Sequence, residues 1–130
     1  MLHGTEEWIE FAERDFEVSK LLAETFNPPL EIIAYHCQQA AEKYLKAVLI
    51  EGNQPVPFIH DLGKLNIECQ KINPELSVIQ SICERLTPFG TVTRYPGGAM
   101  SVEPEHLPLV LSWVQIIRKT IRGQLRFDYP

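Results

Sequence analysis

The segment from Leu30 to Glu51 has the most regular hydrophobic pattern in this chain of 130 residues. Its apolar and small residues recur at steps of three and four, so at 100° per residue they share one side of an α-helix. These residues are Leu30, Ile33, Cys37, Ala40, Ala41, Tyr44 and Val48. Gly52-Asn53 follows, which is a common stop signal for a helix. The sequence therefore predicts a helix over 30–51.

Prolines and glycines divide the rest of the chain into further helical segments. The first is expected over 5–25, with Thr5 as a possible N-cap and one polar interruption, Asp15, in its apolar stripe. That stripe comprises Trp8, Phe11, Ala12, Val18, Leu22 and Phe26. Asn27-Pro28-Pro29 ends the segment, because proline cannot continue a helix.

Three more helical segments follow the second helix. Asp61 is placed to cap a short helix that Asn73-Pro74 ends, and a fourth segment covers 75–86. The last lies within 103–124, where Pro104 and Pro108 allow either a kinked helix or a start near His106. The sequence thus predicts an all-α fold, an antiparallel bundle of four to five helices forming a single domain over 1–130.

Composition and motifs exclude several classes of function. The net charge of −5 disfavours a non-specific DNA-coating protein, which needs a basic surface. The N-terminus resembles no signal segment and no apolar run approaches the roughly 20 residues of a membrane span, so we expect a cytoplasmic protein without membrane contact. Cys37, Cys69 and Cys83 form no CxxC pair, which favours reduced, partly buried thiols. No metal-binding or phosphate-loop motif is present, and we predict no metal and no cofactor.

The polar side of the second helix is the first candidate for a functional site. It carries His36, Gln38, Gln39, Glu42, Lys43 and Lys46. Glu42 and Lys46 are spaced for an ion pair one helical turn apart. The simplest interpretation of such a charged side is a solvated surface. The alternative is that its cations attract a phosphate group.

The second candidate is Thr93-Arg94-Tyr95-Pro96, in an irregular stretch over 87–101 rich in proline and glycine. An arginine offers two parallel donors to a phosphate, and a neighbouring tyrosine offers a surface on which a base can stack. The other interpretation, equally open, is that Tyr95 packs the loop against the bundle while Arg94 is a surface charge.

Together these features resemble the HEPN family of helical domains, whose name refers to nucleotide binding. Four stretches carry the resemblance, in the family's order and spacing: Ala12-Glu13-Arg14-Asp15, the QQAAEK sequence beginning at Gln38, His60-Asp61-Leu62, and Arg94-Tyr95-Pro96. The resemblance implies an antiparallel helical bundle that is commonly a homodimer. It also implies bacterial or archaeal genes that are often paired with a small nucleotidyltransferase in toxin–antitoxin-type modules.

Some members of this family are metal-independent ribonucleases that use an arginine followed four to six residues later by a histidine. The sequence lacks that spacing, because Arg85 and Arg94 precede His106 by far more and no histidine follows Arg118. We therefore expect a non-catalytic module that binds a nucleotide, a nucleotidyltransferase partner, or both. The alternatives are a ribonuclease that uses His60 and Arg94 brought together in space, and a purely structural dimeric module.

The predicted binding site draws on three parts of the chain. Lys43 and Lys46, His60, and Arg94 with Tyr95 are expected to line one polar cleft, because a short loop can return His60 to the second helix. The supporting polar residues are Gln39, Glu42 and Asp61. The ordinary alternative is that Arg94 pairs with Glu42 and Tyr95 fills the core, so that the cleft is structural.

Overall fold

The computed structural model of the chain describes residues 3–90, 101–126 and 129, and every regular element in these ranges is helical. The elements are α1 (His3–Ala23), α2 (Leu30–Glu51), α3 (Leu62–Ile72), η1 (Pro74–Ile79), α4 (Gln80–Leu86), η2 (Thr87–Gly90) and α5 (His106–Gln124). Here η denotes a 3-10 helix. The predicted all-α bundle of four to five helices is confirmed.

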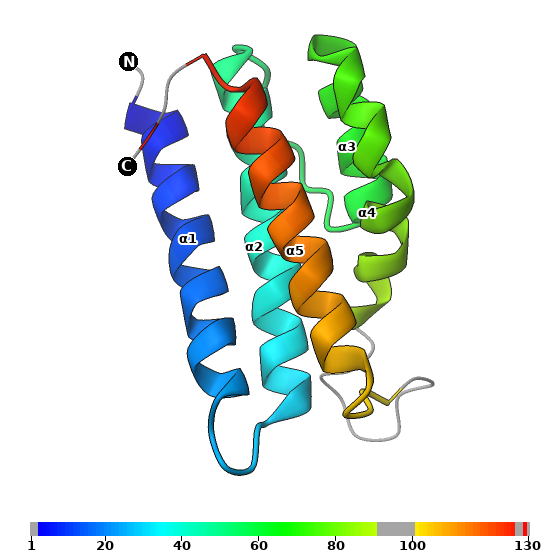
Figure 1. Cartoon of the computed structure of the whole chain (residues 1–130). Coiled ribbons are helices and arrows are strands. Elements are labelled where there is room, and N and C mark those ends of the chain that lie inside the picture. The colour runs from blue at the N-terminus through cyan, green and yellow to red at the C-terminus, as the bar shows by residue number, and fades with distance from the viewer. Residues whose placement is uncertain (1–2, 91–100, 127–128, 130) are drawn as a thin grey trace.

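Helix α2 is the centre of the bundle, with α1 on one side, α3 and α4 on the other, and α5 across it (Figure 1). It packs against α1, α3, α5 and η2, and most of its residues from Ile33 to Leu49 are buried. The apolar residues in this part of the helix are therefore covered within one chain. This packing also buries three of its polar residues, Gln38, Glu42 and Lys46.

The ends of the helices correct several expectations. Thr5 is not an N-cap, because α1 already begins at His3 and Thr5 is buried inside it. Phe26 lies beyond the end of α1 and is fully exposed, so it does not extend the apolar stripe. The segment predicted over 75–86 is a 3-10 helix followed by an α-helix.

Two other ends agree with the sequence. The Asp61 carboxylate accepts a hydrogen bond of 3.0 Å from the backbone N–H of Lys64, which makes Asp61 the N-cap of α3. The last helix begins late, at His106, with Pro104 before it and Pro108 in its first turn. In the first turn the backbone N–H groups have no helical partner, so Pro108 leaves the helix unbroken.

The three cysteines are free and buried, as the sequence favoured. Burial raises the pKa of Cys37 to about 11 and that of Cys69 and Cys83 to about 12. At neutral pH these thiols are protonated and act as small apolar side chains.

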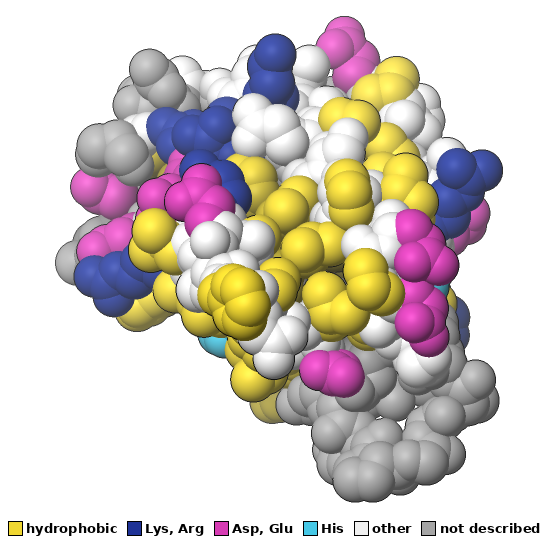
Figure 2. Space-filling view, turned by 60° about the horizontal axis from the view of Figure 1, so that its bottom comes forward, with side chains coloured by type: hydrophobic (Ala, Val, Ile, Leu, Met, Phe, Trp, Pro, Cys, Tyr) yellow, Lys and Arg dark blue, Asp and Glu magenta, His cyan; other side chains and the backbone are white. Residues whose placement is uncertain are grey.

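Some large apolar side chains are exposed on the surface of the bundle. Figure 2, in which the lower end of the bundle is turned toward the viewer, shows hydrophobic side chains gathered across the middle of the face. On α5, Leu109 is 50% and Ile116 42% exposed, while Trp113 is half-buried. Within the described ranges, none of the helices has the length and apolar character that crossing a membrane requires.

Candidate functional site

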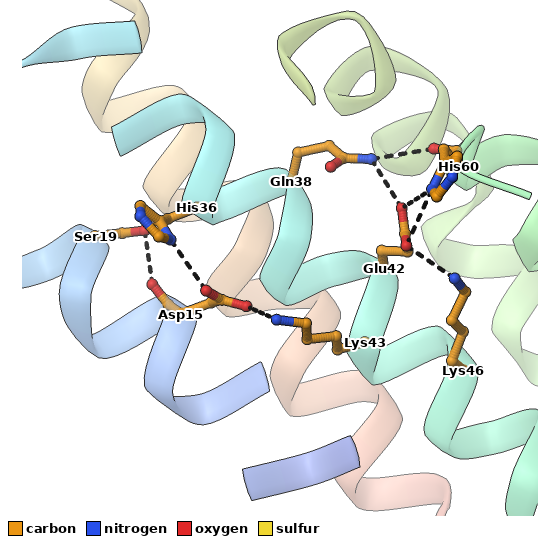
Figure 3. A network of polar contacts seen from close by, with 8 residues as sticks. All are labelled: Asp15, Ser19, His36, Gln38, Glu42, Lys43, Lys46 and His60. Carbon is orange, nitrogen blue, oxygen red and sulfur yellow. Dashed lines mark hydrogen bonds and ion pairs between the residues drawn. The ribbon is translucent and has the colours of Figure 1, made fainter. Parts of the chain in front are cut away.

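Four polar residues form a cluster where the α2–α3 loop returns to the middle of α2: Gln38, Glu42, Lys46 and His60, hereafter the His60 cluster (Figure 3). Glu42 is its centre. The carboxylate accepts a hydrogen bond of 2.9 Å from Lys46 Nζ and lies 3.1 Å from His60 Nδ1. Gln38 Nε2 donates to the His60 carbonyl oxygen at 3.1 Å, which fixes the loop at this point.

The path of the loop explains how His60 reaches Glu42. Asn53 takes a left-handed backbone conformation, with φ of 58°, directly after the C-cap Gly52, and so turns the chain back along α2. Glu42 lies ten residues before Gly52, which is about 15 Å of helix, and eight extended residues span up to about 26 Å. The loop therefore has ample length to bring His60 opposite Glu42.

The two charged residues of α2 in this cluster are buried. The side chain of Glu42 is 6% and that of Lys46 8% exposed, whereas the side chain of His60 is 61% exposed. Removing two charges from water is unfavourable unless they pair with good geometry. The cluster therefore combines a buried ion pair with an exposed histidine.

The contact with Glu42 also orients the imidazole ring. A carboxylate accepts but does not donate, so Nδ1 carries the proton that Glu42 accepts. The other ring nitrogen, Nε2, is then free of this contact, on a side chain that is mostly exposed. A histidine held in this way offers Nε2 to a ligand, as a donor when the ring is protonated and as an acceptor when it is neutral.

A second polar cluster joins α1 to α2 and contains Asp15, His36 and Lys43 (Figure 3). Asp15 accepts hydrogen bonds from Lys43 Nζ and lies 3.0 Å from His36 Nδ1. Ser19 Oγ donates to the Asp15 backbone oxygen at 2.9 Å. The polar interruption in the α1 stripe is thus the residue that neutralises Lys43.

Glu13 connects α1 to α5 in a third polar contact. Its carboxylate accepts hydrogen bonds from Arg118 Nε at 2.9 and 3.0 Å, from Arg122, and from the Tyr44 hydroxyl at 2.9 Å. Burial alone would raise the pKa of the Glu13 carboxyl, but these hydrogen bonds outweigh burial and hold the pKa below its ordinary value. Burial and the nearby Glu13 charge raise the pKa of Tyr44.

The predicted site residues are brought together only in part. Lys46 and His60 meet at Glu42, whereas Lys43 points to Asp15 on α1. Gln39 is half-buried and Asp61 serves as the cap of α3. Arg94 and Tyr95 lie outside the described residues, and so does any contact of Arg94 with Glu42.

The interpretation of the polar side of α2 as a solvated surface is wrong for three of its members. Gln38, Glu42 and Lys46 are buried, because α2 is covered by α1, by the α2–α3 loop and by η2. Lys43 and Lys46 each contact a carboxylate, that of Asp15 and that of Glu42 respectively. The i,i+4 pair of Glu42 and Lys46 is confirmed, although it is buried rather than on the surface.

Two contacts of the cluster were not predicted from the sequence. Gln38 holds the His60 carbonyl, and Trp8 places its ring 5.8 Å from Lys46 Nζ, within the range of a cation–π contact. The signal available for Gln38 was its place one turn before Glu42, on the same side of the helix. No sequence signal links Trp8 to Lys46, because they come from different helices.

The described residues hold no group of three or more histidine, cysteine or acidic side chains arranged to bind a metal ion. The chemistry present is that of an imidazole, an ammonium group and carboxylates. The imidazole, when protonated, and the ammonium group can bind anions, and the imidazole can transfer a proton when a substrate places its reacting atoms beside it.

The fold and the cluster define a small α-helical bundle domain whose central helix carries buried charges beside a loop histidine. Within that class, the HEPN domain family matches this chain over residues 5–123. The chain therefore belongs to the HEPN family. No curated protein sequence and no solved structure matches the chain significantly.

Proposed function

We propose that this HEPN chain is a dimeric, non-catalytic module that binds the phosphate group of a nucleotide or of RNA at the His60 cluster. The observation that carries the proposal is the contact of His60 Nδ1 with the buried carboxylate of Glu42, 3.1 Å away. The contact orients an exposed imidazole, and the buried ammonium group of Lys46 contacts the same carboxylate. Hydrogen bonds between charged groups are stronger than those between neutral groups, which favours an anionic ligand.

The other predicted members of the site extend this proposal. Arg94 would add a bidentate phosphate donor and Tyr95 a stacking surface, while Lys43 would add positive charge from the next turn of α2. The pairing of Lys43 with Asp15 lowers its contribution, so we expect His60 and Arg94 to matter most.

Calorimetric titration with adenosine 5′-monophosphate (AMP) tests the proposal. We expect wild-type protein to bind AMP, and His60→Gln to weaken binding about tenfold or more, the effect of losing one charge-assisted hydrogen bond. His36→Gln is the matched control, because His36 also contacts a carboxylate through Nδ1 but belongs to the other cluster. If wild-type protein binds neither AMP nor a short RNA, the module is purely structural.

The proposed protein partner is suggested by the family resemblance and not by the residues of the His60 cluster. We propose a small nucleotidyltransferase as the partner in a toxin–antitoxin-type pair in a prokaryotic cytoplasm. The three free, buried cysteines fit a reducing compartment. A nucleotidyltransferase encoded beside this chain, forming a complex with it in gel filtration, is the expected result. Two separate peaks would contradict the pairing.

A metal-independent ribonuclease is the second candidate function, and one observation favours it. A histidine oriented by a carboxylate, with its other ring nitrogen exposed, has the geometry of a general acid or base. This activity would use His60 with Arg94. The test is cleavage of single-stranded RNA in the presence of a chelator. Cleavage that is lost in both His60→Ala and Arg94→Ala would establish the enzyme and overturn the non-catalytic proposal.

A further inference from the structure

The His60 cluster continues toward α1 through Lys46 and Trp8. Lys46 Nζ lies 2.9 Å from Glu42 Oε2 on one side and 5.8 Å from the centre of the Trp8 ring on the other. His60 Nδ1 is 3.3 Å from the same Glu42 oxygen. An aromatic ring, a cation, a carboxylate and an imidazole are therefore connected in one row across α1, α2 and the α2–α3 loop.

The length of this row is limited by its contacts. Steps of 5.8, 2.9 and 3.3 Å place the Trp8 ring centre and His60 Nδ1 no more than about 12 Å apart. Trp8 is only partly buried against the core. The separation between the exposed imidazole and the partly buried Trp8 is thus within the length of one nucleotide, from its phosphate to its base.

The burial of Lys46 indicates which part of a ligand each group can contact. With its side chain 8% exposed and its ammonium group paired to Glu42, Lys46 cannot extend to a ligand in solution. It acts on its neighbours instead, because a cation near an aromatic ring holds that ring in place. His60 is left to contact the phosphate, and Trp8 is left to contact an uncharged, flat group.

We propose that Trp8 is the surface on which the base of a nucleoside 5′-monophosphate stacks while His60 binds its phosphate. This inference rests on the function proposed above and adds a residue for the base within the described part of the chain. The nucleotide is either free or the 5′ end of an RNA strand. Stacking on an aromatic side chain tolerates any base, because every base has a flat π face.

The test compares AMP with ribose 5-phosphate, which has the same phosphate and sugar but no base. Stacking on a tryptophan is worth about 1–3 kcal/mol, so wild-type protein should bind AMP roughly 5- to 150-fold more tightly than ribose 5-phosphate. In Trp8→Leu the two ligands should bind equally, while the affinity for ribose 5-phosphate stays unchanged. Trp113→Leu is the matched control, because Trp113 is the other tryptophan and is half-buried on α5.

Fluorescence gives a second readout that does not depend on the stability of Trp8→Leu. In Trp113→Phe, Trp8 is the one remaining tryptophan. AMP should change its emission, whereas ribose 5-phosphate should not. A 5′-phosphorylated adenylate pentamer that binds more tightly than AMP would identify RNA as the source of the nucleotide, and equal binding would identify the free nucleotide.

The results separate the two proposals. If AMP binds to the wild type, but Trp8→Leu keeps the preference for AMP and the emission of Trp8 does not respond, the stacking role of Trp8 is wrong and the phosphate site stands. If neither AMP nor the pentamer binds to the wild type, the proposed function fails and the stacking role fails with it.

Discussion

Gly90 lies against the side chain of Gln38, so closely that a Cβ atom at position 90 would be 2.3 Å from the Gln38 side-chain carbon Cδ. Gln38 is 2% exposed and holds the His60 carbonyl oxygen. The end of η2 therefore touches the residue that positions the His60 loop. A glycine is needed here for space, and the first prediction follows from that contact.

We expect Gly90→Ala to lower the free energy of unfolding by about 1–3 kcal/mol, the usual effect of overpacking a filled interior. The added methyl group must displace the Gln38 side chain, which donates a hydrogen bond to the His60 carbonyl oxygen. Urea unfolding measures the effect. In the double variant with Gln38→Ala the overlap is gone, so its loss should be smaller than the sum of the two single losses.

Gly123 provides the control. A Cβ atom there meets no heavy atom within 4 Å, and Gly123 lies inside α5. Gly123→Ala should therefore stabilise the protein by about 0.5–1 kcal/mol, the difference in helix propensity. Strictly additive losses for Gly90→Ala and Gln38→Ala would contradict the steric explanation.

Lys46→Met should be strongly destabilising, by about 3 kcal/mol, because it leaves the buried Glu42 carboxylate without its lysine partner. The measurement is again urea unfolding. Lys71→Met is the matched control, since Lys71 pairs with Glu68 at 2.8 Å but the two side chains are 69% and 41% exposed. Its effect should stay below about 1 kcal/mol. Equal losses in the two variants would show that burial of the pair does not matter.

The stability contributed by Glu13 should depend on pH. Its pKa is lower in the folded chain than the ordinary value of 4.5, because Arg118, Tyr44 and Arg122 stabilise the carboxylate more than burial destabilises it. A lowered pKa means that the stabilisation is complete above about pH 4.5 and is lost as the pH falls through the folded-state pKa.

The measurement is the difference in melting temperature between wild type and Glu13→Gln. We expect wild type to melt at a clearly higher temperature at pH 7, and the difference to shrink as the pH falls below about 4.5. Glu10→Gln is the control, because Glu10 pairs with Arg14 on the surface, with side chains 53% and 65% exposed. A difference for Glu13→Gln that stays constant down to pH 3 would contradict the role of its charge.

A homodimer remains a prediction, and the exposed side of α5 is where we expect its interface. Leu109 and Ile116 are about half exposed on this helix, and hydrophobic side chains gather on the face shown in Figure 2. Apolar patches of this kind usually mark interfaces. Leu109→Glu and Ile116→Glu should each convert a dimer to a monomer in light scattering at micromolar concentration.

Val78→Glu is the control for this experiment, because Val78 is 71% exposed but lies on η1. It should leave the dimer intact. A wild-type mass equal to one chain would contradict the homodimer, and dissociation caused by Val78→Glu alone would move the interface to η1.

Local features of the sequence were enough to predict where the helical segments lie, although not every helix end or the 3-10 helix η1. The period of the apolar residues and the Gly52-Asn53 stop defined α2 from Leu30 to Glu51, and Asp61 marked the start of α3. Such signals act within one or two turns, so they do not depend on the rest of the fold. The motifs around Gln38 and His60 also identified the family, which the match over residues 5–123 confirms.

The burial and the partners of the charged residues could be found only from the tertiary structure. Helical period assigned Glu42 and Lys46 to a polar side, but it could not show that the α2–α3 loop and η2 cover that side. Likewise, Asp15 neutralises Lys43 across 28 positions of sequence, and Trp8 meets Lys46 from another helix. The spacing of apolar residues describes one helix at a time. The burial and pairing of a charged side chain depend on which other elements pack against that helix. The sequence by itself therefore determined the helices and the residue types of the site, and only packing decided which charges are buried and what they contact.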